Sequence, residues 1–348
     1  MRLRVLSAAV ALACATLGVA TGPAQTAAAH TAEALDAGHF HGVNWAAPGD
    51  NYADGPIALS GLSLTDDYAT TYAKASAVIK GFRRNLGANT VRLPINPYTT
   101  GGTYWSSYRA VIDAATARGF DVVLGYWEGT SAQKDGKIDS LPAFWDMWTT
   151  VTDAYRHNSR VFFEPMNEPF GYTAAQWTDL AAQWLATFPS VPRDRVFVSG
   201  TGYNDSVLAV CADSRLAGTY LSLHHYGFWK QDTGYAAWVA DLKSRIGGCA
   251  SRTVADEFGA PMTSGLNYDE RASDSTDSNS VAFLQADTDT FRALHIGSVY
   301  WPGLRTGDTY TMEALTGSGT HPQLVTTNVT GADRLAWAWG KGHAAMEG

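Results

Sequence analysis

Short apolar runs alternate with helical patterns along most of the chain. The runs are rich in β-branched and aromatic residues, and each has the length of one strand of a buried sheet. Eight such candidates occur, at residues 39–45, 89–95, 120–127, 160–168, 195–200, 219–226, 252–259 and 295–301. Between them, apolar residues recur every three or four positions, which predicts amphipathic helices. The helices are expected near residues 66–86, 105–115, 144–155, 177–185, 234–246, 280–293 and 331–345.

This alternation of eight strands with helices predicts an α/β protein, a single-domain (β/α)8 TIM barrel. A doubly wound open sheet is the alternative, and it usually carries a glycine-rich phosphate-binding turn after its first strand. Here the first strand ends in "GVNWAAPGD", which has no such turn. A partial match, "SGTGYND" at 199–205, lies at the wrong place in the order of elements. The pattern therefore favours the barrel.

The first residues predict an export signal rather than part of the fold. Arg2 and Arg4 precede an apolar run that is too short for a comfortable membrane span. Small residues follow this run, so we expect cleavage after about Ala29. The mature domain would then comprise residues 30–348. We expect it to be secreted and extracellular, with no membrane contact after cleavage.

Composition narrows the class of partner. Removal of residues 1–29 takes away two arginines and no acid, so the formal charge moves from −8 to −10. A negative surface argues against nucleic acid, but it would not repel a neutral polymer. Cys211 and Cys249 remain, and in an exported chain a disulfide between them is more common than a metal or redox site. Neither a zinc-like cluster nor an HExxH motif occurs in the sequence, so we expect no metal and no cofactor.

Polar and aromatic residues concentrate at the carboxyl ends of the predicted strands. In a (β/α)8 barrel this end carries the active site. The residues at these ends, in chain order, are Asn44, Trp45, Arg92, Tyr126, Trp127, Asn167, Glu168, His224, His225, Tyr226, Glu257 and Trp301. The fourth and seventh strands face each other across a small barrel. Glu168 and Glu257 can therefore project into one central cleft.

Two facing carboxyl groups are suited to cleaving a glycosidic bond. A separation of about 5–5.5 Å suits a retaining mechanism, in which one carboxylate attacks the sugar while the other, protonated, protonates the leaving oxygen. Asn167, directly before Glu168, could donate a hydrogen bond to the sugar 2-hydroxyl. Pro169 then turns the chain out of the sheet. We therefore predict a glycosidase with Glu168 and Glu257 as its catalytic pair.

The same residues carry a resemblance to a known family. From about residue 39 to residue 301, the chain resembles glycoside hydrolase family 5, the cellulase and mannanase family of the retaining clan GH-A. The likeness rests on "VRLP", "NEP", a His-x-Tyr pair, "DEFG" and a late tryptophan. These motifs supply Arg92, Asn167, Glu168, Pro169, His224, Tyr226, Glu257 and Trp301.

This resemblance implies a role for each matched residue. Glu168 would be the acid/base, and Glu257 would be the nucleophile. Arg92 and Tyr226 would keep the nucleophile ionised and oriented. His224 would support the acid/base and the substrate.

Tryptophans at strand ends, or in the loops after them, could stack on the apolar faces of sugar rings. The resemblance implies this role for Trp301. For Trp45, Trp127 and Trp229, a sugar platform and a core position are both open. Many family members carry a histidine at the end of the third strand, where this chain has Tyr126 and Trp127. This departure concerns the substrate rather than the reaction.

Other polar residues near these positions are predicted to be structural. Glu164 is expected to point into the barrel and pair with Arg92. Asp256 is expected to face the opposite side of its strand from the neighbouring catalytic candidate. Glu128 is expected to be a solvated loop acid, and His225 a packing residue.

The sequence as a whole predicts a secreted, retaining O-glycosyl hydrolase with an oligosaccharide or polysaccharide as partner, active as a monomer. A plant or microbial glycan of the β-glucan or mannan type is the first substrate to test. An exo-acting furanosidase, releasing arabinofuranose or galactofuranose with the same carboxylates, is an open alternative. A catalytically silent carbohydrate-binding barrel is another. Long connections at 46–66, 127–140, 259–279 and 302–330 are expected to shape the cleft, the last with a small hairpin.

Overall fold

The computed structural model describes residues 35–129, 133–230, 234–270 and 279–342. The predicted signal peptide at 1–29 lies outside the described residues. The strands are β1 (His41–Trp45), β2 (Thr90–Ile95), β3 (Asp121–Tyr126), β4 (Val161–Glu164), β5 (Phe197–Ser199), β6 (Tyr220–Tyr226), β7 (Thr253–Gly259), β8 (Gly297–Leu304), β9 (Glu313–Thr316) and β10 (Gln323–Thr326). The helices are α1 (Tyr68–Leu86), α2 (Pro97–Gly101), α3 (Tyr104–Thr116), α4 (Leu141–Tyr155), α5 (Ala174–Thr187), α6 (Thr201–Asn204), α7 (Leu208–Ala212), α8 (Tyr235–Ile246), α9 (Asn279–Leu294) and α10 (Val329–Ala338).

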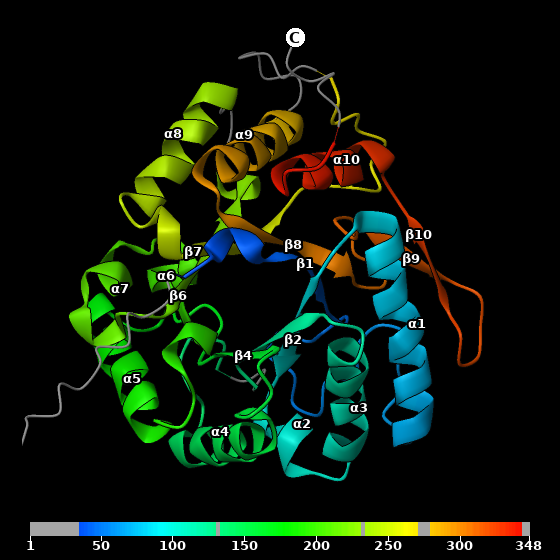
Figure 1. Cartoon of the computed structure of the whole chain (residues 1–348), viewed down its shortest axis with the longest axis vertical. Helices are drawn as coiled ribbons and strands as arrows, with labels where there is room; N and C mark the ends of the chain where they lie inside the picture. Colours follow the sequence, from blue (N-terminus) through cyan, green and yellow to red (C-terminus); the bar gives the residue numbers. More distant parts are fainter. Residues whose placement is uncertain (1–34, 130–132, 231–233, 271–278, 343–348) are drawn as a thin grey trace, which may run out of the picture. The chain divides into compact units, whose positions relative to one another are not determined.

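Strands β1 to β8 form one parallel sheet, and the helices surround it (Figure 1). Each strand lies beside its neighbour in sequence, and β8 pairs with β1, in the order β4-β3-β2-β1-β8-β7-β6-β5. A parallel bridge between Phe163 and Val196 joins the two ends of this order and nearly closes the barrel. The prediction of a (β/α)8 barrel is confirmed.

The predicted strands and the observed strands differ most at β4. The sequence predicts a strand up to residue 168, but β4 ends at Glu164 and the next residue is Pro165, which has no N–H to give to a sheet. The "NEP" triplet therefore lies in a loop, where Glu168 adopts a φ of +47°. The predicted hairpin is confirmed as the antiparallel pair β9 and β10.

Helix ends follow the local sequence. At α1, the Asp67 side chain accepts a hydrogen bond from the Thr70 N–H, which satisfies one of the free donors of the first turn. The helix ends at Gly87, whose φ of +72° is the left-handed conformation that glycine adopts without strain. Helix α5 begins with a capping box between Thr173 and Gln176.

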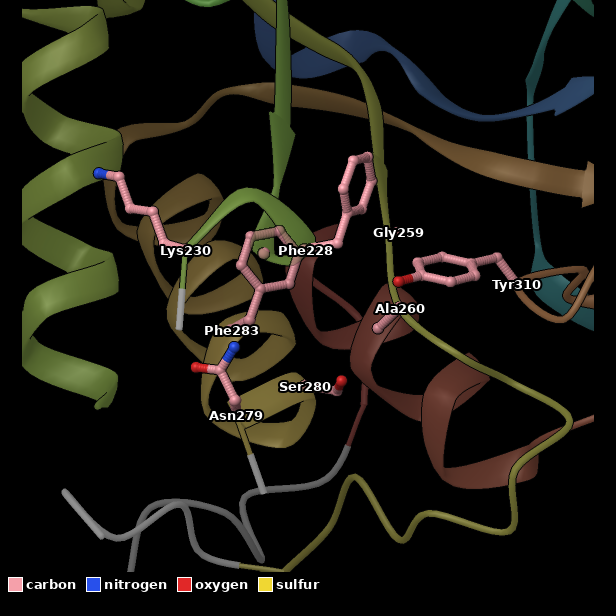
Figure 2. Close-up of a pocket in the computed structure, with 9 residues that line it drawn as sticks. Phe228, Lys230, Gly259, Ala260, Asn279, Ser280, Phe283 and Tyr310 are labelled. Atoms are coloured by element: carbon pink, nitrogen blue, oxygen red, sulfur yellow. The ribbon is translucent and has the colours of Figure 1, made fainter. Parts of the chain in front are cut away.

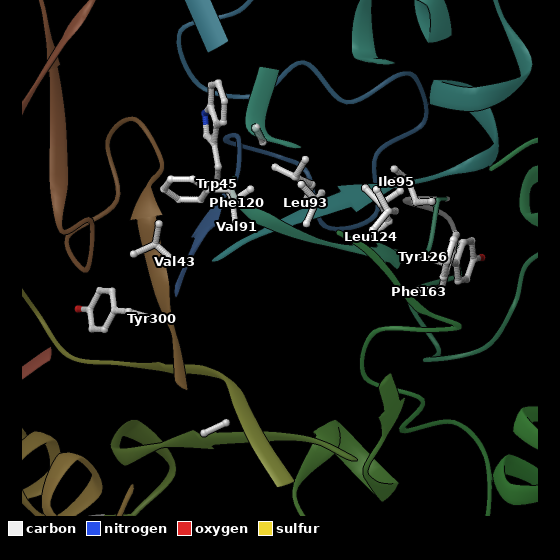
Figure 3. Close-up of a cluster of buried hydrophobic side chains, with 14 of the residues drawn as sticks. Val43, Trp45, Val91, Leu93, Ile95, Phe120, Leu124, Tyr126, Phe163 and Tyr300 are labelled. Carbon is white, nitrogen blue, oxygen red and sulfur yellow. The ribbon is translucent and has the colours of Figure 1, made fainter. Parts of the chain in front are cut away.

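The larger hydrophobic core fills the space between the sheet and the helices. Figure 3 shows its side chains on neighbouring strands, among them Val43, Val91 and Leu124. Trp45 belongs to this core, with its ring edge-on to Phe82 of α1 at 6.2 Å between centroids. Three helix tryptophans that the sequence placed in the core are fully buried, as predicted: Trp148, Trp177 and Trp184.

A second core closes the amino-terminal end of the barrel interior. Phe40 packs its ring edge-on against Phe162, Phe197 and Tyr220, at 4.9–5.0 Å between centroids. Buried aromatic rings in this arrangement stabilise beyond the area that they bury. The apolar floor limits the polar part of the interior to the carboxyl end of the strands, where the site lies.

The predicted disulfide is confirmed. Cys211 of α7 is bonded to Cys249, with 6.4 Å between their Cα atoms, so the loop after β5 is tied to the segment before β7. In the part of the chain that the structure describes, none of the helices has the length and apolar character needed to cross a membrane.

Candidate active site

Arg92 is the centre of a polar layer above the apolar floor. Its side chain, from β2, is almost fully buried. Nε and Nη2 donate to the two carboxylate oxygens of Glu164 at 2.6 and 3.1 Å, and Nη1 donates to Glu257 Oε1 at 2.6 Å. Nη2 also donates to Asn167 Oδ1 at 2.6 Å. A buried guanidinium with this many acceptors is fixed in position, and it orients every group that it bonds.

Glu257 is held on both carboxylate oxygens. Besides the bond from Arg92 to Oε1, the Tyr226 hydroxyl donates to Oε2 at 2.9 Å. Neither oxygen is free to rotate away, and both bonds favour the ionised form of the carboxyl. Glu257 is therefore built to remain an oriented carboxylate.

Glu168 has a different environment. Its Oε1 lies 3.0 Å from His224 Nδ1, and its side chain is 19% exposed at the cleft. The His224 ring is buried, and burial together with the charge of Arg92 lowers the pKa of His224 well below its ordinary value. A neutral imidazole can donate one bond to Glu168, or accept one, without fixing the charge of the carboxyl.

These environments give the two carboxyl groups different pKa values. Burial raises the pKa of Glu168 well above its ordinary value, and the nearby Glu257 raises it further. Burial also raises the pKa of Glu257, to about 7, but Arg92 and Tyr226 oppose this effect. Glu257 therefore ionises first, and its charge then holds the proton on Glu168. The geometry therefore places a carboxyl that favours the ionised form beside one that favours the protonated form, which is the arrangement that two-carboxylate chemistry needs.

The two carboxyls meet in one cleft. An oxygen of Glu168, an oxygen of Glu257 and a ring nitrogen of His224 all lie within 4.8 Å of one another. The cleft above them has a volume of about 490 Å³. Its lining includes the predicted residues Trp127, Asn167, Glu168, Tyr226, Glu257 and Trp301. The structure therefore brings these six predicted residues together in one cleft.

The four tryptophans that the sequence offers as possible sugar platforms take different positions. Trp301 lines the cleft and stacks on Trp127, with 5.2 Å between ring centroids. Trp229 is on the surface, 69% exposed. Trp45 corrects the prediction that it could be a sugar platform, because it is fully buried and its Nε1 donates to the Ser60 carbonyl at 3.0 Å.

Asp256 is a second correction. Strict alternation would place it on the opposite face from Glu257, but its carboxylate lies 3.4 Å from Arg92 Nε inside the barrel. The pairing of β6 with β7 shifts register here, since Leu223 pairs with Ala255 and His224 with Glu257. Asp256 is the extra residue of this β-bulge, and a bulge re-aims the side chains around it.

Glu128 is a third correction. It is buried rather than solvated, and its two carboxylate oxygens accept the N–H groups of Asp135 and Gly136 at 2.9 Å. It therefore fixes the loop after β3. His225 packs as predicted, buried between Asp287 and Asp241 at 2.8 and 3.1 Å.

Sequence reasoning missed the loop residues of the cleft. The cleft is also lined by Asp50, Asn51, Phe228, Arg305, Asp308, Thr309 and Tyr310. Arg305 ties two of the loops together, because it pairs with Asp50 and with Asp308. Their positions in the long connections were the available signal. Below the cleft, Asn44 accepts a bond from Arg92 Nη1 at 3.0 Å.

Among the residues that the structure describes, two clusters have the donors that a metal ion would need. They are Glu164, His224 and Asp256, and Glu168, His224 and Glu257. In both clusters, however, Arg92 already contacts carboxylates, at 2.6 Å from Glu164 and 2.6 Å from Glu257. A guanidinium supplies the positive charge that these carboxylates require, so their arrangement does not call for a metal.

A smaller cavity of about 310 Å³ adjoins the cleft and shares Phe228 and Tyr310 with it. Figure 2 shows Asn279, Ser280 and Phe283 of α9 on its wall. Among the described residues, its lining is apolar or neutral except for Lys230.

The fold and the paired carboxylates define a class: a retaining glycoside hydrolase on a (β/α)8 barrel. Comparison with known proteins agrees. A family model described as Cellulase (glycosyl hydrolase family 5) matches residues 50–302, well over half of the chain. The chain therefore belongs to glycosyl hydrolase family 5, as the sequence motifs predict.

Solved structures share the fold at low identity. The catalytic domain of the major endoglucanase from Xanthomonas campestris pv. campestris matches with a TM-score of 0.64 and 18% identity, covering 87% of this chain and 95% of that chain. An endocellulase from Pyrococcus horikoshii in complex with cellotetraose matches with a TM-score of 0.61 and 18% identity, covering 85% and 92%.

Proposed function

We propose that the protein is a secreted endo-acting β-glucanase, with Glu257 as nucleophile and Glu168 as acid/base. In the first step, a Glu257 oxygen bonds to the anomeric carbon while the glycosidic C–O bond breaks and the Glu168 proton moves to the leaving oxygen. In the second step, Glu168 takes a proton from water, and the resulting hydroxide displaces Glu257. Two inversions at one carbon retain its configuration.

The observation that carries the proposal is the different support of the two carboxyls. Glu257 receives two hydrogen bonds that favour its charge, whereas Glu168 faces a neutral histidine. Asn167 lies between Arg92 and the cleft, where its amide can reach the 2-hydroxyl of the sugar. Trp301 and Trp127 supply a stacked aromatic wall for the ring.

A row of aromatic rings supports a polymeric substrate. Phe228 lines the cleft, and its ring lies beside that of Trp229, with 4.9 Å between ring centroids. The next centroid distances along the row are 6.1 Å from Trp229 to Tyr203 and 4.2 Å from Tyr203 to Phe170, on which Tyr203 stacks. Phe228, Trp229 and Tyr203 are 55%, 69% and 40% exposed. Exposed rings of this kind suit the apolar faces of successive sugars. A substrate can thus extend beyond the cleft, which favours endo action on a chain. The match to the cellulase family, together with relatives described as endoglucanase and endocellulase, favours a glucan.

The test is an activity panel on the purified mature protein. It contains carboxymethyl cellulose, mixed-linkage glucan, mannan, xylan and arabinogalactan, with nitrophenyl glycosides in pyranose and furanose forms. We expect oligosaccharides from a β-glucan, with the β-anomer formed first by proton NMR. Glu257→Ala, which removes the nucleophile, should show no turnover. Release of only a furanose monomer would replace the proposal with an exo-furanosidase, and a first-formed α-anomer from a β-glucan would contradict the retaining assignment.

The aromatic row has its own test. Trp229→Ala should raise KM for the polymer while leaving kcat/KM for a short aryl cellobioside unchanged, because a short substrate does not reach the row. Trp229→Phe keeps a ring and is the matched control. An equal loss on both substrates would show that the row does not bind the chain.

A further inference from the structure

The loop after β5 places an asparagine against the backbone of Glu168. Asn204 is fully buried, and its Oδ1 accepts a hydrogen bond from the Glu168 N–H at 3.1 Å. Its Nδ2 donates to Ser222 Oγ at 3.1 Å. Both polar atoms of the amide are thus used, one toward the loop after β4 and one toward strand β6. A buried amide with this geometry cannot turn without leaving a polar group unpaired.

The segment that carries Asn204 is itself anchored. A bridge between Thr201 and Ser206 closes the turn, and Arg245 of α8 donates to the Asp205 carbonyl at 3.0 Å. Asn204 adopts a φ of +53°, a conformation that asparagine tolerates better than most residues. The turn therefore presents a fixed acceptor to the Glu168 N–H.

Glu168 needs such an acceptor because its backbone is strained. Its φ of +47° is uncommon for a residue other than glycine, and Pro169 restricts it further. A conformation of this kind costs on the order of 1–3 kcal/mol and persists only where the surroundings fix it. The bond from Asn204 is such a restraint, together with the bond from the Phe170 N–H to the Glu168 carbonyl at 2.8 Å.

The same amide leads to the support of the nucleophile. Ser222 Oγ, which accepts a bond from Asn204, lies within hydrogen-bond distance of Glu164 Oε1, at 2.9 Å, and of Asp256 Oδ2, and can donate its one proton to either. Glu164 is bonded to Arg92, and Arg92 to Glu257. One continuous set of hydrogen bonds therefore joins the backbone of the proton donor to the carboxylate of the nucleophile.

We propose that Asn204 is a positioning residue for the acid/base of this hydrolase: it holds the Glu168 backbone in the left-handed conformation that aims the carboxyl at the leaving oxygen. This inference rests on the assignment of Glu168 as acid/base. Asn204 is not among the residues that line the cleft, so it would act through Glu168. Its effect should fall on proton transfer rather than on sugar binding.

Leaving groups separate that effect from a general loss of structure. An unactivated phenol needs the Glu168 proton as the C–O bond breaks, whereas 2,4-dinitrophenolate leaves without it. The parameter kcat/KM reports this first step for both. The main variant is Asn204→Gly, because glycine adopts a φ of +53° without strain and removes only the side chain. The substrates are phenyl and 2,4-dinitrophenyl β-cellobioside, or the same aryl glycosides of whichever sugar the activity panel identifies.

We expect Asn204→Gly to lower kcat/KM for the phenyl glycoside by about 10- to 100-fold, since a displacement of about 1 Å costs a factor of this order. For the dinitrophenyl glycoside, kcat/KM should fall less than about threefold. Azide, which needs no base to attack the glycosyl-enzyme, should raise the variant's turnover of the dinitrophenyl substrate. Equal losses on the two substrates, or no loss on either, would overturn the proposal.

Two further variants complete the design. Asn96→Ala removes another buried asparagine side chain with three hydrogen bonds, at the start of α2, and should lower stability without changing the ratio of the two substrates. Asn204→Asp keeps the acceptor for the Glu168 N–H. If Asn204→Gly does not fold, the test is the ratio of kcat/KM for the phenyl glycoside to kcat/KM for the dinitrophenyl glycoside in Asn204→Asp. A ratio that differs from that of the parent enzyme would contradict the assigned role of Oδ1. Glu168→Ala is measured in parallel; without a leaving-group effect there, the acid/base assignment fails instead.

Discussion

Replacement of Tyr226 by phenylalanine tests how the site keeps Glu257, the proposed nucleophile, ionised. The Tyr226 hydroxyl donates to Glu257 Oε2 at 2.9 Å, and Arg92 serves the other oxygen. Phenylalanine keeps the ring and removes only the donor. Glu257 then retains one of two charge-stabilising bonds in a site where burial already raises its pKa to about 7.

The size of the effect follows from the bond. A hydrogen bond to a charged group contributes about 1.5–3 kcal/mol, and about 1.4 kcal/mol corresponds to one pKa unit. Loss of the Tyr226 donor should therefore raise the pKa of Glu257 by about one to two units. Because Glu257 must be ionised to attack, the acidic limb of the pH profile moves to higher pH. Glu168 and Glu257 interact, so the limb reports the pair.

The assay is kcat/KM for a dinitrophenyl glycoside from pH 4 to 9. This substrate does not require the acid, so its acidic limb follows the nucleophile. Tyr108→Phe is the matched control, since Tyr108 is fully buried and its hydroxyl donates to the Pro94 carbonyl rather than to a carboxylate. An acidic limb that stays in place in Tyr226→Phe, or that moves to lower pH, would refute the reasoning.

Three further predictions concern stability. Burial and Glu164 raise the pKa of Asp256 well above its usual range, so this group stabilises the fold at low pH and loses that contribution as pH rises. Asp256→Asn should therefore flatten the decline in Tm between pH 5 and 8. An unchanged slope of Tm against pH would contradict this assignment. Replacing Cys211 and Cys249 by serine removes a crosslink between residues 38 apart in the sequence. The free energy of unfolding, measured in urea, should fall by about 4 kcal/mol, and a fall of less than about 1 kcal/mol would contradict a stabilising role of the disulfide. Phe40→Ala removes the central side chain of the apolar floor and should lower the free energy of unfolding by about 3–5 kcal/mol in the same measurement. A near-neutral result would show that the floor is not tightly packed.

Much of the fold could be predicted from the sequence because the strands and helices follow from the local periodicity of apolar residues. Apolar runs and helical spacings predict the eight strands and the longer helices but not the short helices α2, α6 and α7, and the polar strand ends indicate the edge that carries the site. Long loops were recognised as cleft-forming from their length. The residues that these loops contribute to the cleft cannot be predicted in this way, because contacts such as the pairing of Arg305 with Asp50 join residues 255 apart. No local pattern encodes such a contact.

The errors came from rules that tertiary structure overrides. Asp256 faces Arg92 because a bulge breaks the alternation of β7. Trp45 is at a strand end, as a platform would be, but packs on Phe82 because the last residue of β1 faces α1 rather than the cleft. Glu128 is buried because nearby backbone N–H groups need an acceptor.

The sequence by itself determined the class of this protein, since a barrel pattern with two carboxyls at facing strand ends leaves few other chemistries. Only the tertiary structure decided which carboxyl is held ionised and which keeps its proton. Those properties depend on Arg92, Tyr226 and His224, which come from three places in the chain and meet at distances of about 3 Å or less from their carboxyl partners. The support of Glu168 by Asn204, 36 residues away, was likewise decided there, because a hydrogen bond to a strained backbone leaves no trace in local sequence pattern.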